Sequence, residues 1–227
     1  MNKNLFSHIE KYMISCMRDS AHDREHIYRV LYNALEIAKS ENHVDYDVLI
    51  GACLLHDIGR KEQFKNPALC HAMAGGEQAY HFLIDSGCEH NYAEQVKQCI
   101  QTHRFRKNNP PQSTEAKILF DADKLDVTGA IGRARTLLYK GTVNEPIYTK
   151  MPNGTVSNGE NDADPSFFQE YKRKLETMYS NFYTKKGFEL AQQRKRTAVA
   201  FYENLLQELQ ETYEKGVNEL SKVIKQE

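Results

Sequence analysis

A histidine and an aspartate end an apolar run in the stretch "CLLHDIGR", residues 53–60. The residues at 52–55 are of the type usually found buried, and His56 and Asp57 follow them directly. Removing a titratable pair from water is costly unless a partner compensates for the lost hydration. A bound metal ion would supply that compensation, so the stretch predicts a metal site.

A further histidine belongs to the preceding predicted helix. His26 lies in "HDREHIYRV", and apolar residues at 30, 31, 35 and 37 mark the core side of this helix. Imidazole nitrogen and carboxylate oxygen together suit Mn²⁺, Fe²⁺, Co²⁺, Ni²⁺ or Zn²⁺ better than Ca²⁺. The pattern therefore favours either redox-inert hydrolysis or iron chemistry.

The remaining ligand is expected to be a carboxylate from "ILFDADKLD", residues 118–126. At about 100° per residue, the apolar positions define an inward arc, and Asp123 and Asp126 lie nearer to it than Asp121 does. Asp123 is therefore the first choice as a ligand. Asp121 and Asp126 are expected to be hydrogen-bonding or capping neighbours.

Helical periodicity dominates the chain and predicts an all-α protein. Asp23 is a candidate helix cap, Asn66-Pro67 is typical of a cap and first turn, and Ser113 is expected to open another helix. A helix should also follow Gly129. Together with the other capping and helix-breaking residues, the pattern predicts helices near 4–18, 23–40, 45–57, from Asn66-Pro67 to about 86, 91–103, 166–182 and 185–213.

The polar stretch 141–165, rich in Gly, Asn and Pro, predicts a long loop that is either a lid or a disordered segment. A chain of 227 residues is long enough for one substantial core. We expect a single domain over 1–227, with a metal-site core at about 20–140 and C-terminal helices over 166–227.

The composition excludes several classes of protein. The 30 Lys and Arg nearly balance the 31 Asp and Glu, so no global field favours a nucleic acid polymer or an anionic membrane as partner. The five cysteines contain no C-x-x-C pair, which argues against a disulfide framework and a thiolate zinc site. With no apolar run of about 18 residues, the chain is expected to be a cytoplasmic protein without a membrane span. A homodimer is one open alternative for its oligomeric state.

These motifs, in this order, resemble the H…HD…D signature of the HD-domain metal-dependent phosphohydrolase superfamily. The flanking residues are similar too: "H-x-x-R-V" at 26–30, "L-L-H-D-I-G" at 54–59 and "D-A-D-K-L-D-x-x-G-A-I-G-x-A-R" at 121–135. They look like a bacterial subfamily of small hydrolases that act on nucleotides. The similarity spans roughly 20–140, with a weaker match through "A-x-x-R" at 191–194, and implies an all-α helical bundle of the HD-domain type with additional C-terminal helices.

The resemblance implies one divalent ion, Mn, Mg, Co, Ni, Fe or Zn, held by His26, His56, Asp57 and Asp123. Asp57 would also take part in proton transfer or reach toward a second metal. Such an ion lowers the pKa of a bound water from about 16 toward about 7 and polarises a phosphoryl oxygen. The expected reaction is hydrolysis of a nucleotide or similar small phosphorylated molecule, and the nearest subfamily suggests release of pyrophosphate from nucleoside triphosphates.

A phosphorylated substrate also needs cationic neighbours. The motif "HDIGRKEQFK" supplies Arg60, Lys61 and Lys65, and "THRFRK" supplies Arg104, with Arg106 and Lys107 beside it. These are the candidate substrate-binding residues. The other candidate catalytic groups are Glu62, as a base or an orienting residue, and His71 and His103, as hydrogen-bond or proton donors to the leaving phosphate.

Two other functions compete with hydrolysis. Di-iron oxygenases of the same fold add two histidines between the HD pair and the last aspartate, which His103 with either His71 or His81 could supply. A non-catalytic ligand-sensing HD module would lack one of the ligands, and here none is missing. Apart from these possibilities, four histidines are expected at the surface or in packing: His8, His43, His81 and His90.

Overall fold

The computed structural model describes residues 1–17, 24–104, 106 and 108–224. The predicted cap Asp23 and the candidate cation Lys107 lie outside these residues. Within the described ranges the regular structure is helical, and the sole β pairing is an isolated bridge between Lys150 and Val156. The predicted all-α class is confirmed.

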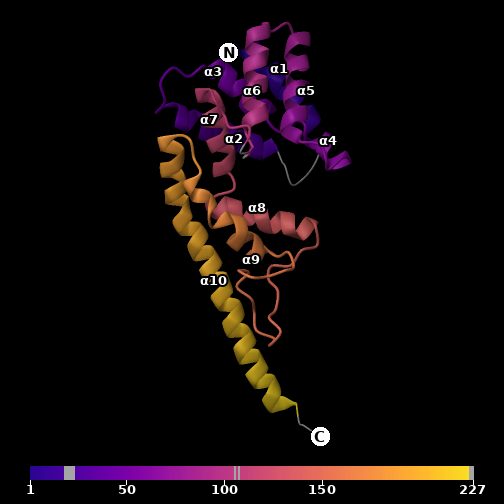
Figure 1. Ribbon diagram of the computed structural model, residues 1–227, viewed down its shortest axis with the longest axis vertical. Helices are drawn as coiled ribbons and strands as arrows, with labels where there is room; N and C mark the ends of the chain where they lie inside the picture. Colours follow the sequence, from indigo (N-terminus) through magenta and orange to yellow (C-terminus); the bar gives the residue numbers. More distant parts are fainter. Residues whose placement is uncertain (18–23, 105, 107, 225–227) are drawn as a thin grey trace. The chain divides into compact units, whose positions relative to one another are not determined.

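Contacts divide the chain into two compact units. One comprises Met1–Asp126 with Phe182–Leu190, and the other comprises Val127–Asn181 with Ala191–Glu227. All the candidate metal ligands belong to the first unit. Its helices, shown in Figure 1, are α1 (Lys3–Cys16), α2 (Arg24–Ala38), α3 (Tyr46–Leu55), α4 (Arg60–Lys65), α5 (His71–Asp85), α6 (His90–Thr102) and α7 (Thr114–Leu125).

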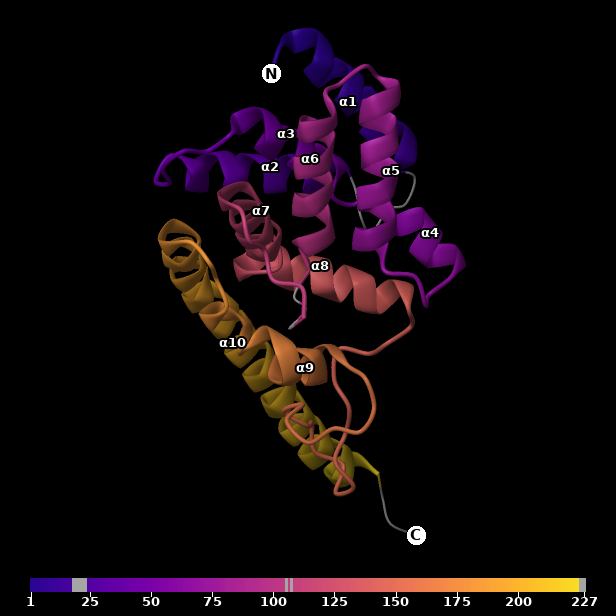
Figure 2. The same cartoon turned by 45° about the horizontal axis from the view of Figure 1, so that its top comes forward.

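Helix α3 is the centre of the first unit. It packs against α1, α2, α6 and α7, while α5 and α6 lie side by side (Figure 2). Its apolar residues are buried on every side, as in a helix surrounded by neighbours. The N-terminal end is held by Asp45, whose side chain accepts from the amides of Asp47 and Val48. The C-terminal end delivers His56 and Asp57 into the interior.

Two glycines bring the start of α5 against the end of α3. A Cβ on Gly59 would lie 2.4 Å from the carbonyl oxygen of His71 and 2.6 Å from the amide nitrogen of Gly75. Gly75 in turn approaches the backbone of Gly59 and His56. Only glycine allows this approach of backbones, and it places His71 next to the HD pair.

The C-terminal end of α7 is attached to a distant segment of the chain. Asp121 is fully buried and accepts from the amides of Tyr183 and Thr184 and from the Thr184 hydroxyl, at 2.7–3.1 Å. This anchor orients α7 and therefore Asp123, two residues further on. Asp121 is a hydrogen-bonding residue, as the sequence led us to expect, and it is buried because the segment Phe182–Leu190 covers its side of the helix.

The second unit is built from aromatic residues around α8 (Gly129–Thr142). Tyr171 stacks on Tyr202 with ring centroids 4.0 Å apart, and Phe168 meets Tyr202 edge to face at 5.2 Å. The Tyr202 hydroxyl donates to the carbonyl of Asn158 at 2.5 Å. These rings come from α9 (Phe167–Glu170), the π-helical turn η1 (Tyr171–Leu175) and α10 (Lys185–Val223), and the 3₁₀ turn η2 (Met178–Ser180) follows η1.

The long loop before α9 is organised around one carboxylate. Asp162 accepts from the hydroxyls of Thr149 and Ser157, and its carbonyl accepts from the Gln169 amide. Val156 and Ser157 are buried. Of the stretch 141–165, the first two residues end α8, and the rest contains no helix and has an internal hydrogen-bonded framework.

Some predicted helices differ from those observed. Asn66 ends α4 and starts a turn in which its side chain accepts from the Ala68 amide, so the helix predicted from Asn66-Pro67 begins only at His71. The short helix α4 was not expected. The predicted helix over 166–182 is divided into α9, η1 and η2, while α10 continues to Val223 instead of ending near 213.

A search of the described residues for a helix both long and apolar enough to cross a membrane finds none.

Candidate metal centre

Two histidines and two aspartates from three segments of the first unit converge on one point. Nε2 of His26, on α2, lies 3.3 Å from Nε2 of His56 and 3.3 Å from Oδ1 of Asp123, on α7. Oδ2 of Asp57 is 3.5 Å from His26 Nε2 and 3.8 Å from His56 Nε2. The structure therefore brings together all four ligands expected from the sequence.

The opposite ring nitrogen of each histidine is held by an acceptor. His26 Nδ1 donates to Oδ2 of Asp126 at 2.8 Å, and Arg29 Nε fixes the other oxygen of Asp126 at 2.7 Å. His56 Nδ1 donates to the carbonyl of Cys53 at 2.8 Å. Because Nδ1 is committed in both rings, Nε2 is the nitrogen that each presents to the centre.

A second pair of histidines faces the other oxygen of Asp57. His71 Nε2, at the start of α5, lies 3.4 Å from Asp57 Oδ1, and His103 Nε2, at the end of α6, lies 3.8 Å from it. Arg60 Nε donates to the same oxygen at 2.9 Å. Asp57 is thus shared between two groups of potential metal ligands, His26, His56 and Asp123 on one side and His71 and His103 on the other.

The carboxylates and histidines of the centre shift one another's pKa values. Burial opposes charge on His26, but hydrogen bonds to Asp123 and Asp126 outweigh it and raise its pKa to about 10. Burial would raise the pKa of Asp57, yet the charges of Arg60 and His56 hold it well below its usual range. The pKa of Asp123 is likewise low, since the hydrogen bond to His26 outweighs burial.

The second pair behaves in the opposite way. Burial, supported by the charge of Arg60, lowers the pKa of His71 to about 2. Burial and the neighbouring His56 lower the pKa of His103 to about 4. Both imidazoles are neutral at pH 7 and keep a lone pair for binding a cation.

These residues fit a divalent transition metal. Ligand atoms at about 2.0–2.2 Å from one ion lie about 3–3.5 Å from each other in octahedral or tetrahedral geometry. The separations of 3.3–3.8 Å around His26 Nε2 and His56 Nε2 agree with this after a small contraction. Among the described residues, Asp57 Oδ2 is a buried oxygen with no hydrogen-bond partner, as expected of a ligand atom. Asp123, 27% exposed, leaves the centre open to solvent.

The predicted cations lie around this centre at different distances from it. Arg60 contacts Asp57, whereas Lys61 and Lys65 are exposed on α4. Nη1 of Arg104 lies 3.9 Å from Sγ of Cys70, the residue before α5, and Arg106 is exposed. The structure therefore joins only Arg60 directly to a ligand by a contact seen in the described part of the chain.

Glu62 lies near α1. Its charge acts on Tyr12 and Cys16 of α1, and Oε2 is buried with no hydrogen-bond partner in the described ranges. Its assignment as a base or an orienting residue stays a prediction. The histidines expected at the surface are exposed, and so is His81, which leaves His71 as the partner of His103: His8, His43, His81 and His90.

Gln63 is a site residue that the sequence interpretation missed. Its Oε1 accepts from His71 Nδ1 at 2.7 Å, and its Nε2 donates to the carbonyl of Leu69 at 3.1 Å. Gln63 lies four residues before Pro67, and none of the motifs described above gives it a role. It belongs to α4, a helix that the sequence did not predict, so no sequence signal identifies it.

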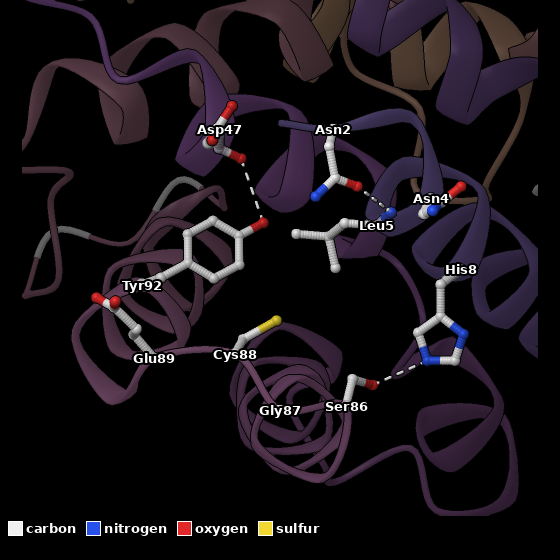
Figure 3. Close-up of a pocket in the computed structure, with 10 residues that line it drawn as sticks. All are labelled: Asn2, Asn4, Leu5, His8, Asp47, Ser86, Gly87, Cys88, Glu89 and Tyr92. Carbon is white, nitrogen blue, oxygen red and sulfur yellow. Dashed lines mark hydrogen bonds between the residues drawn. The ribbon is translucent and has the colours of Figure 1, made fainter.

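A separate surface pocket of about 670 Å³ lies between the start of α1 and the turn from α5 to α6 (Figure 3). His8 and Ser86 are hydrogen-bonded at 2.9 Å on one side, and the Tyr92 hydroxyl donates to the Asp47 carbonyl at 3.3 Å on the other. None of the clustered histidines or aspartates lines it. The chemistry therefore belongs to the metal centre and not to this pocket.

Comparisons with known proteins agree with the geometry. Residues 24–128 match the model of the HD domain family. YpgQ of Bacillus subtilis (strain 168) is 28% identical over 190 residues, which cover 82% of this chain and 83% of YpgQ.

Two solved structures are similar over nearly the whole chain. Bacillus subtilis YpgQ in complex with ADP has a TM-score of 0.70 at 26% identity, covering 90% of this chain and 97% of that one. A predicted HD superfamily hydrolase from an uncultured Thermotogales bacterium has a TM-score of 0.59 at 28% identity, covering 91% and 92%. Residues 24–128 are therefore an HD domain, and the chain is similar to a protein described as an HD superfamily hydrolase.

Proposed function

We propose that the protein hydrolyses a phosphate bond of a nucleotide or a similar small phosphorylated molecule, with release of pyrophosphate from nucleoside triphosphates as the first reaction to test. The ligands of the ion are His26, His56, Asp57 and Asp123. The observation that carries the proposal is the convergence of two Nε2 atoms and two carboxylate oxygens at one point. The partial exposure of Asp123 supports it, because a substrate must reach that point.

The residues of this chain have separable tasks in such a reaction. A divalent ion at these ligands, when bound, lowers the pKa of a coordinated water and polarises a phosphoryl oxygen. Asp126 and the Cys53 carbonyl hold His26 and His56 in the orientation that presents Nε2. Asp57 is the group nearest to both histidine pairs, which suits it to proton transfer.

Arg60 is the first candidate for binding the phosphate. Its bond to Asp57 uses one of five guanidinium donors, and its side chain is 29% exposed. The exposed Lys61 and Lys65 and the half-buried Arg104 are further candidates. ADP in the crystal structure of YpgQ supports a nucleotide as the ligand class.

The test is a substrate screen with the purified protein. Phosphate and pyrophosphate release are measured on a panel of nucleotides and sugar phosphates, after chelation and resupply of Mn²⁺, Mg²⁺, Co²⁺, Ni²⁺ or Zn²⁺. We expect metal-dependent release from at least one nucleotide, lost in Asp57→Ala and kept in Asp85→Ala, an exposed aspartate at the end of α5. No release from any member of the panel with any ion would reject the proposal.

A di-iron oxygenase is the second candidate function, and one observation favours it. Such a centre requires two additional imidazoles, and His71 and His103 lie 3.4 and 3.8 Å from Asp57 Oδ1. Turnover under strict exclusion of oxygen distinguishes the two functions. The hydrolase retains its full rate without oxygen, whereas the oxygenase stops.

A further inference from the structure

Arg133 is a buried cation in the second unit, in the first turns of α8. The residue is 0% exposed. Its Nη2 donates to the carbonyl oxygen of Val127 at 3.1 Å. Nε and Nη1, which together carry three of the five guanidinium N–H groups, are buried and have no hydrogen-bond partner in the described part of the chain. Most of the donor capacity of this side chain is therefore unused.

The start of α8 fixes the position of Arg133. A Cβ on Gly132 would lie 2.2 Å from the carbonyl carbon and oxygen of Val127, so the lack of a side chain there lets the helix begin against the backbone of Val127. This close approach brings the Val127 oxygen to Nη2 and holds the guanidinium group inside the second unit.

No carboxylate neutralises this guanidinium group within the described ranges. The side chains whose charges act on Arg133 are Tyr171 and Tyr179, and phenols carry no charge at pH 7. Burial lowers the pKa of Arg133, but a guanidinium group keeps its proton at pH 7. Its Cζ lies 5.4 Å from the centre of the Tyr171 ring, a contact that offsets only part of the lost hydration. A buried charge normally has a partner of opposite charge, so the geometry calls for an anion.

Tyr179 supplies a second buried donor. Its hydroxyl has no hydrogen-bond partner among the described residues, and the residue is 3% exposed. The Tyr179 carbonyl accepts from Nε2 of Gln192 at 2.9 Å, which fixes η2 to α10. Nζ of Lys195, an exposed residue one turn further along α10, lies 5.9 Å from the centre of the Tyr179 ring. Tyr179 is thus near enough to Arg133 for their charges to interact, and it has a surface cation against its ring.

We propose that Arg133 and Tyr179 bind a phosphate group, with Lys195 adding positive charge at the surface. Guanidinium and phenol groups donate hydrogen bonds to phosphate oxygens, and two cations match the charge of a phosphate dianion. The three residues belong to the second unit, whereas the four metal ligands belong to the first. The inference does not rest on the proposed function, because this binding requires neither metal nor turnover.

The test measures phosphate binding by the full-length protein after a chelator has removed the metal and has itself been removed, so that no ion at the metal centre can hold the phosphate. Thermal unfolding and isothermal titration calorimetry are followed with inorganic phosphate, with adenosine monophosphate, and with chloride at the same ionic strength. We expect saturable binding and a higher unfolding temperature with phosphate but not with chloride. Tighter binding of the monophosphate than of phosphate would identify a nucleotide as the source of the phosphate group.

Arg133→Met replaces the guanidinium group with an apolar side chain. It should abolish phosphate binding and raise the unfolding temperature in phosphate-free buffer, because a buried charge without a counterion is removed. Arg173→Met, at an exposed position on η1 in the same unit, is the matched control and should bind phosphate like the parent.

Tyr179→Phe covers the case in which Arg133→Met does not fold. It removes only the hydroxyl and should weaken phosphate binding about 10-fold, because one hydrogen bond to a charged group is lost. A parent protein that does not bind phosphate would overturn the site. Equal phosphate binding by the parent, Arg133→Met and Tyr179→Phe would overturn it as well, because the phosphate would then lie elsewhere.

Discussion

Oδ2 of Asp126 accepts a hydrogen bond from Nδ1 of His26 at 2.8 Å, although the two residues are 100 positions apart in the sequence. The same carboxylate receives Nε and Nη2 of Arg29 at 2.7 and 3.1 Å. The aspartate is therefore fixed from one side by α2 and holds the ring of His26 toward the centre. A ligand supported in this way should lose affinity for metal when its support is weakened.

Asp126→Asn should accordingly lower the affinity for Mn²⁺ about 10- to 100-fold, because the amide keeps the shape of the carboxylate but not its charge. Isothermal titration calorimetry on the metal-free protein measures the change. Asp85→Asn is the matched control, since Asp85 is exposed on α5. An affinity equal to that of the parent would show that Asp126 does not support His26.

Asp123 and Asp121 should respond differently to the same substitution. Asp123→Ala removes a carboxylate that faces the histidines, so we expect loss of bound metal and activity. Asp121→Ala instead leaves the Tyr183 and Thr184 amides without their acceptor and should cost about 2–4 kcal/mol of stability, with metal still bound to the folded protein. Elemental analysis and thermal unfolding separate the two results. Greater loss of metal in Asp121→Ala would reverse the assignment.

Arg60→Ala should keep the bound metal ion and lower kcat/KM about 10- to 100-fold, because a charged hydrogen bond lost at the transition state costs about 1.5–3 kcal/mol. Lys65→Ala tests the exposed end of α4 in the same assay. Lys39→Ala is the control, since Lys39 is 71% exposed and pairs with Glu36. If both variants have the kcat/KM of the parent protein, Arg60 and Lys65 do not bind the substrate.

Metal binding should release a proton from His26. Its pKa is raised to about 10 in the metal-free protein, so at pH 7 it is charged and must lose a proton to bind an ion. We expect the apparent affinity for Mn²⁺ to rise about tenfold per pH unit from pH 7 to pH 9. Calorimetry in two buffers of different ionisation enthalpy measures the number of protons released on metal binding. Release of no proton at pH 7 would contradict the raised pKa of His26.

The same pKa predicts a pH dependence for the metal-free fold. Since the pKa is raised above the value of about 6.5 for an unfolded histidine, the stabilisation is complete below pH 6.5 and is lost as the pH rises through about 10. The unfolding temperature of the metal-free protein should therefore fall between pH 7 and pH 10. His26→Gln should flatten this part of the profile.

Gly59→Ala should destabilise the protein and displace His71. The new Cβ would lie 2.4 Å from the backbone carbonyl oxygen of His71, so the backbone itself would have to move, and overpacking of this kind costs about 1–3 kcal/mol. The control is Gly216→Ala on α10, where a Cβ meets open space. Alanine there should raise the free energy of unfolding by about 0.5–1 kcal/mol. Equal unfolding temperatures for Gly59→Ala and the parent would show that the turn accommodates a side chain.

Local signals in the sequence predicted most of the fold. Ser113 caps α7 as expected, because a cap needs only the Ala116 amide three residues away. Asn66 carries the same kind of signal but starts a turn, since its side chain bonds the Ala68 amide at two residues instead of three. Sequence alone does not distinguish these two outcomes, and the predicted start of α5 was wrong for that reason.

The candidate site was predictable in its residues but not in its division into two groups. His26, His56, Asp57 and Asp123 are each marked by a flanking motif. The position of His71 depends on the approach of Gly59 to Gly75, and its tautomer depends on Gln63. Both are contacts between segments that no periodicity describes. The burial of Asp121 likewise depends on residues about 60 positions further along the chain.

The attachment of Asp121 to Tyr183 and Thr184 has a consequence for how the protein is made. It closes a loop across 62 positions, and closing such a loop costs about 3–4 kcal/mol of chain entropy before any contact repays it. During synthesis, every metal ligand leaves the ribosome well before Thr184 does. A nascent chain that ends before this residue keeps the carboxylate of Asp121 without its acceptor bonds, so the centre can take its final geometry only after the start of α10 has been translated.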